Sequence, residues 1–139
     1  MNSDSHIHSA FDRDLEAVQA MIMKMGGLVE AAIINAADAL EARDDEAADQ
    51  VRRSDKAIDA LEEQVNVACA RLIALRSPIA GDLRTVLTVI KIASSLERCG
   101  DFAKNLAKRS TVLSQMAPIP GAALAIRRMA KTVELQLKD

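Results

Sequence analysis

Apolar residues recur every three or four positions along three long segments of the chain. The first stripe runs from Phe11 to Leu40, the second from Val51 to Leu75, and the third from Leu83 to about Val112. Such spacing places one apolar face on each of three long helices. Because the connections between them are short, the pattern predicts an antiparallel, up-down three-helix bundle.

The helix ends are marked by residues that cannot continue a helix or that cap one. The charged segment EARDDEAA ends the first helix, and Asp44 or Asp45 can cap the second. The second helix should end near Arg76, because Pro78 disfavours helical backbone at the residue before it. Pro118 and Pro120 should close the third helix in the same way.

These boundaries divide the chain into four parts. We expect a flexible N-terminal tail over residues 1–9, a three-helix unit over 10–116, a Pro/Gly linker over 117–121 and an amphipathic helix over 122–139. The last part resembles the first helix at an offset of 104 residues. The matching pairs are Met25 and Met129, Val29 and Val133, Glu30 and Glu134, and Ile33 and Leu137. We interpret it as the start of a second three-helix repeat, which makes the chain a truncated form of a longer protein.

Composition supports an all-α fold and narrows the function classes. Hydrophobic residues make up 50% of the chain, but the only aromatics are two Phe, so Ala, Leu, Ile, Val and Met must form the core. With 18 Lys and Arg against 20 Asp and Glu, and no Tyr or Trp, nucleic acid is not an expected partner. No apolar run approaches the roughly 20 residues that a membrane span needs, and Cys69 and Cys99 are isolated, so we expect a cytoplasmic protein.

Polar residues interrupt the apolar stripe of the third helix. Glu97 occupies an inner position where Leu or Ile is expected, and a buried charge needs a partner. Asp101 and Asn105 follow at intervals of four residues, which places all three on one helix face. The second stripe has its own polar inner position at Ser54.

The second helix supplies two further carboxylates at the same spacing. If it folds back on the third helix about the turn at 77–79, residues whose numbers sum to about 156 lie at the same level. Asp59 then faces Glu97, and Asp55 faces Asp101. Four ionised carboxylates this close would repel one another, so positive charge is expected among them.

The residues leave three interpretations open. Arg52, Arg53 and Arg98 could form salt bridges with the cluster, or the oxygen atoms could bind a metal ion. With no histidine in these helices, the ligand set favours Mg, Mn, Ca or Fe over Zn. Catalysis by paired carboxylates is the third interpretation, but neither a nucleophile elbow nor Glu-x-x-His pairs are present, so we expect no enzyme.

Three segments in this order resemble the PhoU family of phosphate-signalling proteins. They are DKAIDALE at 55–62, SPIAGDLR at 77–84, and IKIASSLERCGDFAKNLA at 90–107. The combination of LERxGD with DLR about a dozen residues earlier is more specific than any single ExxxD motif. The resemblance extends over nearly the whole chain.

The resemblance implies an all-α protein with two three-helix repeats and metal-binding E(D)xxxD motifs. Carried over to this chain, the metal set is Asp55, Asp59, Glu97, Asp101 and Asn105. It further implies a cytoplasmic homodimer that represses the phosphate-starvation response, with the ATPase of a phosphate ABC transporter and a membrane sensor histidine kinase as partners. Membrane association would then be peripheral, through those partners. The alternative is a structural or dimerising helical module whose acidic face is only salt-bridged.

Overall fold

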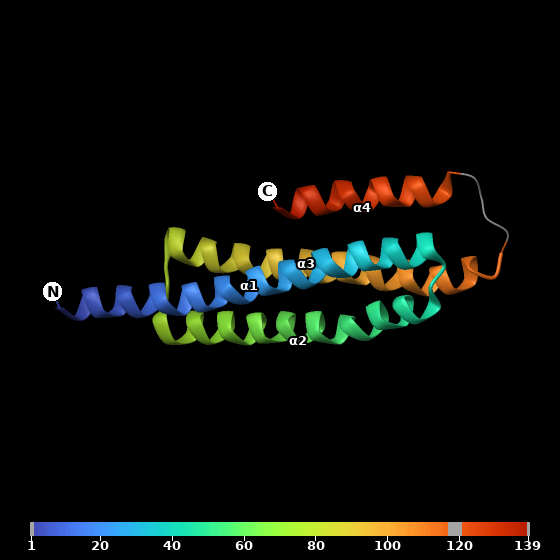
Figure 1. Ribbon diagram of the computed structural model, residues 1–139. Coiled ribbons are helices and arrows are strands. Elements are labelled where there is room, and N and C mark those ends of the chain that lie inside the picture. Colours follow the sequence, from blue (N-terminus) through green and yellow to red (C-terminus); the bar gives the residue numbers. More distant parts are fainter. Residues whose placement is uncertain (1, 117–120, 139) are drawn as a thin grey trace.

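The computed structural model describes residues 2–116 and 121–138, and within these residues every regular element is a helix. The four helices are α1 (Asn2–Ala42), α2 (Asp45–Arg76), α3 (Ala80–Leu113) and α4 (Ala122–Lys138). Helices α1, α2 and α3 run antiparallel in sequence order, and each packs against the other two (Figure 1). The predicted all-α, up-down three-helix bundle is therefore confirmed.

The predicted helix ends also agree with the structure. The Asp44 carboxylate accepts a hydrogen bond from the backbone N–H of Ala47 at 3.1 Å, which caps α2. Helix α2 ends at Arg76, and Ser77 adopts the left-handed conformation that terminates a helix before Pro78. At the other end of the bundle, Arg43 donates hydrogen bonds to the backbone carbonyls of Leu113, Ser114 and Met116. This side chain joins the α1–α2 connection to the end of α3.

The predicted N-terminal tail and the predicted linker before α4 do not both appear in the structure as expected. Where a flexible tail was expected over residues 1–9, α1 already begins at Asn2. The apolar stripe starts only at Phe11, so sequence periodicity gave no signal for the first turns. The predicted linker lies mostly outside the described residues, although Gly121 has the positive φ of 82° that favours glycine.

The core is built from aliphatic side chains and alanine, as the composition predicts. Its largest fully buried members are Met25, Ile33 and Ile58. Two inner positions differ from the predicted stripes by one residue: Asp55 is buried where Ser54 was expected, and Leu96 where Glu97 was expected. Helix α2 thus carries an acidic residue within its buried stripe, while Glu97 lies half-buried at the margin of the core.

Helix α1 contains a longer apolar segment than we expected from the sequence. The part of α1 from Ala10 to Ala42 is long enough, and contains a segment apolar enough, to cross a membrane by length and composition alone. Lys24 and Glu30 are the only charged residues between Glu16 and Asp38, which makes this part of α1 apolar. The expectation that no apolar run is long enough to span a membrane was therefore wrong. The property is weak evidence for a membrane span, since the core helix of a helical bundle has it too, and α1 packs against the three other helices.

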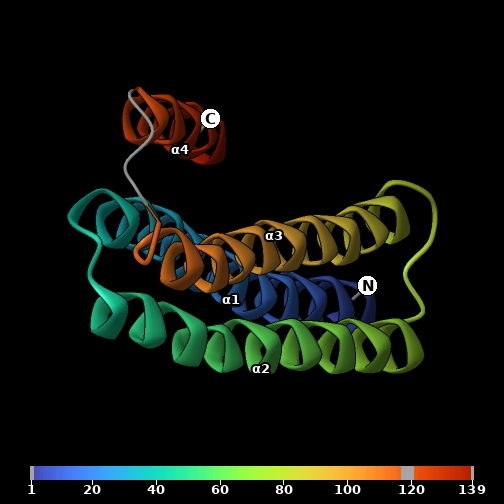
Figure 2. The same ribbon diagram turned by 90° about the vertical axis from the view of Figure 1, so that its right-hand side faces the viewer.

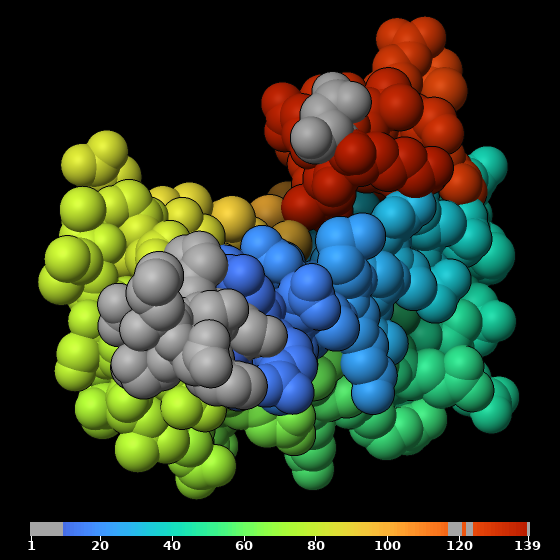
Figure 3. Space-filling view, turned by 90° about the vertical axis from the view of Figure 1, so that its left-hand side faces the viewer, coloured from blue at the N-terminus to red at the C-terminus, as the bar shows by residue number. Residues whose placement is uncertain are grey.

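Helix α4 lies antiparallel to α1 and contacts, among the described elements, only that helix (Figures 1 and 2). Arg127 forms ion pairs with Asp38, at 2.5 Å, and with Glu41, while Lys138 lies 3.5 Å from Glu30. In Figure 3, α4 projects from the bundle above α1 and leaves an open recess beside α3. Ala130 of α4 is buried, and Val133 and Leu137 pack against the core, so α4 is attached by apolar packing as well as by ion pairs.

The glycines of α1 and α3 have different surroundings. At the Gly26–Gly27 pair of α1, a Cβ at either position would meet nothing within 4 Å, so no neighbouring helix approaches closely there. At Gly100, a Cβ would lie 3.2 Å from Ile58 Cδ1 and 3.5 Å from Asp55 Oδ1. The missing side chain of Gly100 therefore lets α2 and α3 approach closely at the level of Asp55.

We predict opposite effects for alanine at these two positions. Gly27→Ala should stabilise the protein by about 0.5–1 kcal/mol, because it improves helix propensity at an exposed site. Gly100→Ala should destabilise it by about 1–2 kcal/mol, because the buried Ile58 must move. Urea unfolding of both variants measures the two values, and a gain in stability for Gly100→Ala would contradict the close approach.

Candidate metal centre

Three carboxylates from two helices meet at the seam between α2 and α3. Asp55 and Asp59 lie one turn apart on α2, and Asp101 projects from α3 opposite them. One oxygen of each lies within 4.8 Å of the others. The structure therefore confirms the predicted juxtaposition of Asp55 and Asp101, and it brings Asp59 to the same point.

Asp55 is the buried member of this group. Its side chain is only 4% exposed, and its Oδ1 has no hydrogen-bond partner among the described residues. The other oxygen, Oδ2, lies 3.5 Å from the Lys104 ammonium of α3. A buried carboxylate oxygen without a donor is costly, and a bound cation would remove that cost.

Two glutamates extend the cluster toward the α2–α3 connection. A side-chain hydrogen bond with Asp101, together with desolvation and the charges of Asp101, Glu62 and Asp59, raises the pKa of Glu97 to about 7. The pKa of Glu62 is also raised, by desolvation and then by the charges of Asp59 and Asp101. Desolvation and the charges of Asp55 and Asp101 raise the pKa of Asp59, against a smaller lowering by Lys104. Desolvation and hydrogen bonding are the larger causes of these raised pKa values, and the neighbouring negative charges add to them.

The remaining predicted participants lie at the edge of this cluster or outside it. Asn105 is exposed on α3 one turn beyond Asp101, and its place in a ligand set stays a prediction. Arg52 pairs with the exposed Asp49 at 3.4 Å, and the cation closest to Asp55 is Lys104, not one of the three proposed arginines.

Sequence reasoning missed Glu62 and Lys104. Lys104 lies three residues after Asp101, a spacing that brings it to the same side of α3, so helical geometry could have indicated it. Glu62 lies three residues after Asp59 on α2 and could have been found in the same way. Both were overlooked because only four-residue spacings were considered.

The donor set fits a hard cation better than it fits acid-base catalysis. Asp55, Asp59 and Asp101 offer three convergent carboxylate oxygens, and Glu97 lies beside Asp101. Oxygen-only sets of this kind suit Mg²⁺, Mn²⁺, Ca²⁺ or iron. The orphaned Oδ1 of Asp55 and the raised pKa values are what a site for a cation would show without its cation.

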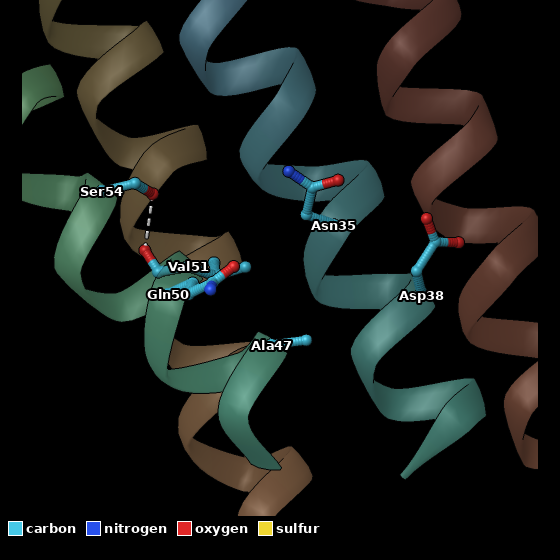
Figure 4. Close-up of a pocket in the computed structure, with 6 residues that line it drawn as sticks. All are labelled: Asn35, Asp38, Ala47, Gln50, Val51 and Ser54. Carbon is cyan, nitrogen blue, oxygen red and sulfur yellow. Dashed lines mark hydrogen bonds between the residues drawn. The ribbon is translucent and has the colours of Figure 1, made fainter. Parts of the chain in front are cut away.

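Apart from the carboxylate cluster, a hollow of about 410 Å³ opens between α1 and α2 (Figure 4). Its lining residues are Asn35, Asp38, Ala47, Gln50, Val51 and Ser54. The Ser54 hydroxyl donates to the Val51 carbonyl, and Asp38 is paired with Arg127 of α4. With these polar groups already engaged, the hollow offers less chemistry than the carboxylate cluster.

Comparison with known proteins gives consistent matches over most of the chain. Residues 22–110 match the family model described as PhoU domain. A phosphate-specific transport system accessory protein PhoU homolog of Caulobacter vibrioides is 37% identical over 134 residues, covering 96% of this chain and 58% of the relative. The homolog of the same description from Xylella fastidiosa (strain Temecula1) is 43% identical over 125 residues, covering 88% and 52%.

A solved structure agrees with the sequence matches. The crystal structure of PhoU from Pseudomonas aeruginosa superposes with a TM-score of 0.87 at 34% identity, and the match covers 92% of this chain and 61% of that protein. The chain thus spans between about half and three fifths of the length of these relatives.

We predict that the metal-free protein loses stability as pH rises. The folded-state pKa of Glu97, about 7, lies above its ordinary value of 4.5, so its stabilising contribution is complete below pH 4.5 and is lost as pH rises through 7. The loss should be roughly 1–2 kcal/mol after allowance for partial exposure. Urea unfolding in chelator between pH 5 and 8 measures it. Glu97→Gln should flatten the profile, whereas the exposed Glu63→Gln should leave it unchanged.

Proposed function

The chain belongs to the PhoU domain family, and from this premise we propose that it acts in the regulation of phosphate transport. The curated relatives are named as accessory proteins of the phosphate-specific transport system. Because the chain spans only part of their length, their role is carried over as a proposal. The proposed activity is negative regulation of phosphate uptake and phosphate-starvation signalling by a cytoplasmic protein without enzymatic activity.

The observation that carries the mechanistic part is the carboxylate cluster at the α2–α3 seam. A bound divalent metal or iron ion would supply positive charge to three carboxylates that otherwise repel one another. Asp55 and Asp59 would hold it from α2, and Asp101 from α3, with Glu97 and Asn105 as further oxygen donors. Ligands from two helices would fix their relative position and so stabilise one bundle surface.

The proposed partners follow from the family and from the shape of the molecule. The extended helical faces of the bundle suit protein contacts. In the proposed role, this surface binds the ATPase of the phosphate transporter and a sensor histidine kinase, which would bring the protein to the membrane only through them. A homodimer is part of the same proposal.

One observation favours a second candidate function, a structural or dimerising module without metal. The Lys104 ammonium lies 3.5 Å from Asp55 and supplies part of the required positive charge within the chain. If such salt bridges are sufficient, the acidic seam needs no ion.

Metal titration separates the two candidates. Addition of Mn²⁺ or Mg²⁺ to the chelated protein should raise the melting temperature, because the ion binds the folded state only. At an ion concentration of 100 times Kd the gain in stability should be about 2.7 kcal/mol. Asp101→Asn should abolish most of this gain, and elemental analysis after dialysis should show the corresponding loss of metal.

The control for this experiment is Asp12→Asn, which removes one exposed carboxylate from α1 far along the sequence from the seam. It should respond to metal like the parent protein. If the parent neither binds metal nor gains stability from it, the salt-bridged module is the correct interpretation.

A further inference from the structure

A charged hollow lies on the same α2–α3 seam, and Asp55 and Asp59 of the carboxylate cluster are part of its lining. Its volume is about 600 Å³. Its lining residues are Asp49, Arg52, Arg53, Asp55, Lys56, Asp59, Lys104 and Lys108. Five of these eight residues are cationic and three are acidic, so the lining carries a net positive charge at neutral pH.

The cations come from both walls of the hollow. Arg52 and Lys56 lie one turn apart on α2, and Lys104 and Lys108 lie one turn apart on α3. In the antiparallel hairpin, Arg52 lies at about the level of Lys104. A compact anion in this hollow can therefore meet positive charge from two helices at once.

Most of this positive charge is not consumed by neighbouring carboxylates. Arg52 is paired with Asp49 and Lys104 with Asp55. Among the described residues, no carboxylate lies within 4.0 Å of the cationic nitrogens of Arg53, Lys56 or Lys108. Like charges gathered at one concave place repel one another, and a multivalent anion would relieve that repulsion.

We propose that this hollow binds a phosphate-type oxyanion, either as free inorganic phosphate or as the phosphate group of a small organic ester. Guanidinium groups offer paired N–H donors to a tetrahedral oxyanion, and ammonium groups act as point charges. The cations occupy only about two turns of each helix, which suits a compact anion rather than an extended acidic peptide. The binding uses side chains of the protein and does not rest on the proposed metal.

Besides Asp55 and Asp59, which line the hollow themselves, Lys104 links the hollow to the carboxylate cluster, because its ammonium lies 3.5 Å from Asp55. In the chelated protein it is shared between Asp55 and the bound anion. The cations outside the cluster, Arg52 and Lys108 in particular, are therefore the residues whose removal tests the anion site without altering the metal ligands.

The test is a titration of the full chain with inorganic phosphate and, in a separate arm, glycerol phosphate. Isothermal titration calorimetry, in chelator at low ionic strength and pH 7.5, measures the binding in each arm. The parent protein should bind at least one of these probes saturably, and the tighter arm identifies the source of the phosphate group. The double variant Arg52→Gln/Lys108→Gln should bind roughly tenfold more weakly.

The matched control is Lys24→Gln/Lys91→Gln, which removes the same charge from exposed positions on α1 and α3 that do not line the hollow. It should bind within about twofold of the parent. Absence of saturable binding in both arms, or equal weakening in the control, would overturn the proposal. Binding that requires Mn²⁺ and survives Arg52→Gln/Lys108→Gln would also overturn it, because the metal would then hold the anion.

Failure of this site and failure of the proposed metal site are distinguishable. Asp101→Asn should retain phosphate binding, since Asp101 does not line the hollow. Arg52→Gln/Lys108→Gln should retain the gain in melting temperature on addition of Mn²⁺. Loss of phosphate binding in Asp101→Asn to the same extent as in Arg52→Gln/Lys108→Gln would overturn the assignment of the anion to these cations.

Discussion

The structure of the seam depends on one buried carboxylate, that of Asp55. A charge in the core stripe of α2 can be accommodated only where the facing helix leaves room and supplies compensation. Gly100 leaves the room, because its missing side chain lets Asp55 and Ile58 lie directly beneath α3. Lys104 compensates one oxygen and leaves the other without a partner. The close α2–α3 contact and the clustering of acidic side chains are thus consequences of the same local arrangement.

The sequence predicts the fold well because its helices are long and strongly patterned. A stripe that repeats over about thirty residues averages out errors of single positions, and the aspartate and proline signals at Asp44 and Pro78 fix the helix ends. The N-terminal boundary could not be predicted in this way, because α1 extends beyond its apolar stripe. For α4, the helix itself was predicted, but Met129 is 55% exposed where its counterpart Met25 is fully buried. Ion pairs to α1, which periodicity does not reveal, contribute to its attachment.

The site was predicted less completely, for reasons of geometry. The α-helix has 3.6 residues per turn, so a stripe drifts, and a pattern alone cannot decide whether Ser54 or Asp55 faces the core. The spacing of the second stripe favoured Ser54 at the inner position, but Gly100 on the facing helix leaves room for the side chain of Asp55. Pairing residues across the α2–α3 hairpin by their distance from the turn nevertheless placed Asp55 opposite Asp101, because that turn is short. Glu62 and Lys104 lie three residues after Asp59 and Asp101, so the four-residue spacing of the carboxylates did not reveal them.

The acidic and basic parts of the seam cannot be electrostatically independent. Lys104 belongs to both, and its charge now partly offsets that of Asp55. A cation bound by the carboxylates would offset Asp55 instead, which would leave the Lys104 charge to act on the neighbouring hollow. Positive potential there would rise, and with it the affinity for an anion; by thermodynamic reciprocity, a bound anion would favour the cation to the same extent. The seam is therefore suited to couple the binding of two oppositely charged ions through Lys104 and the two aspartates that line the hollow.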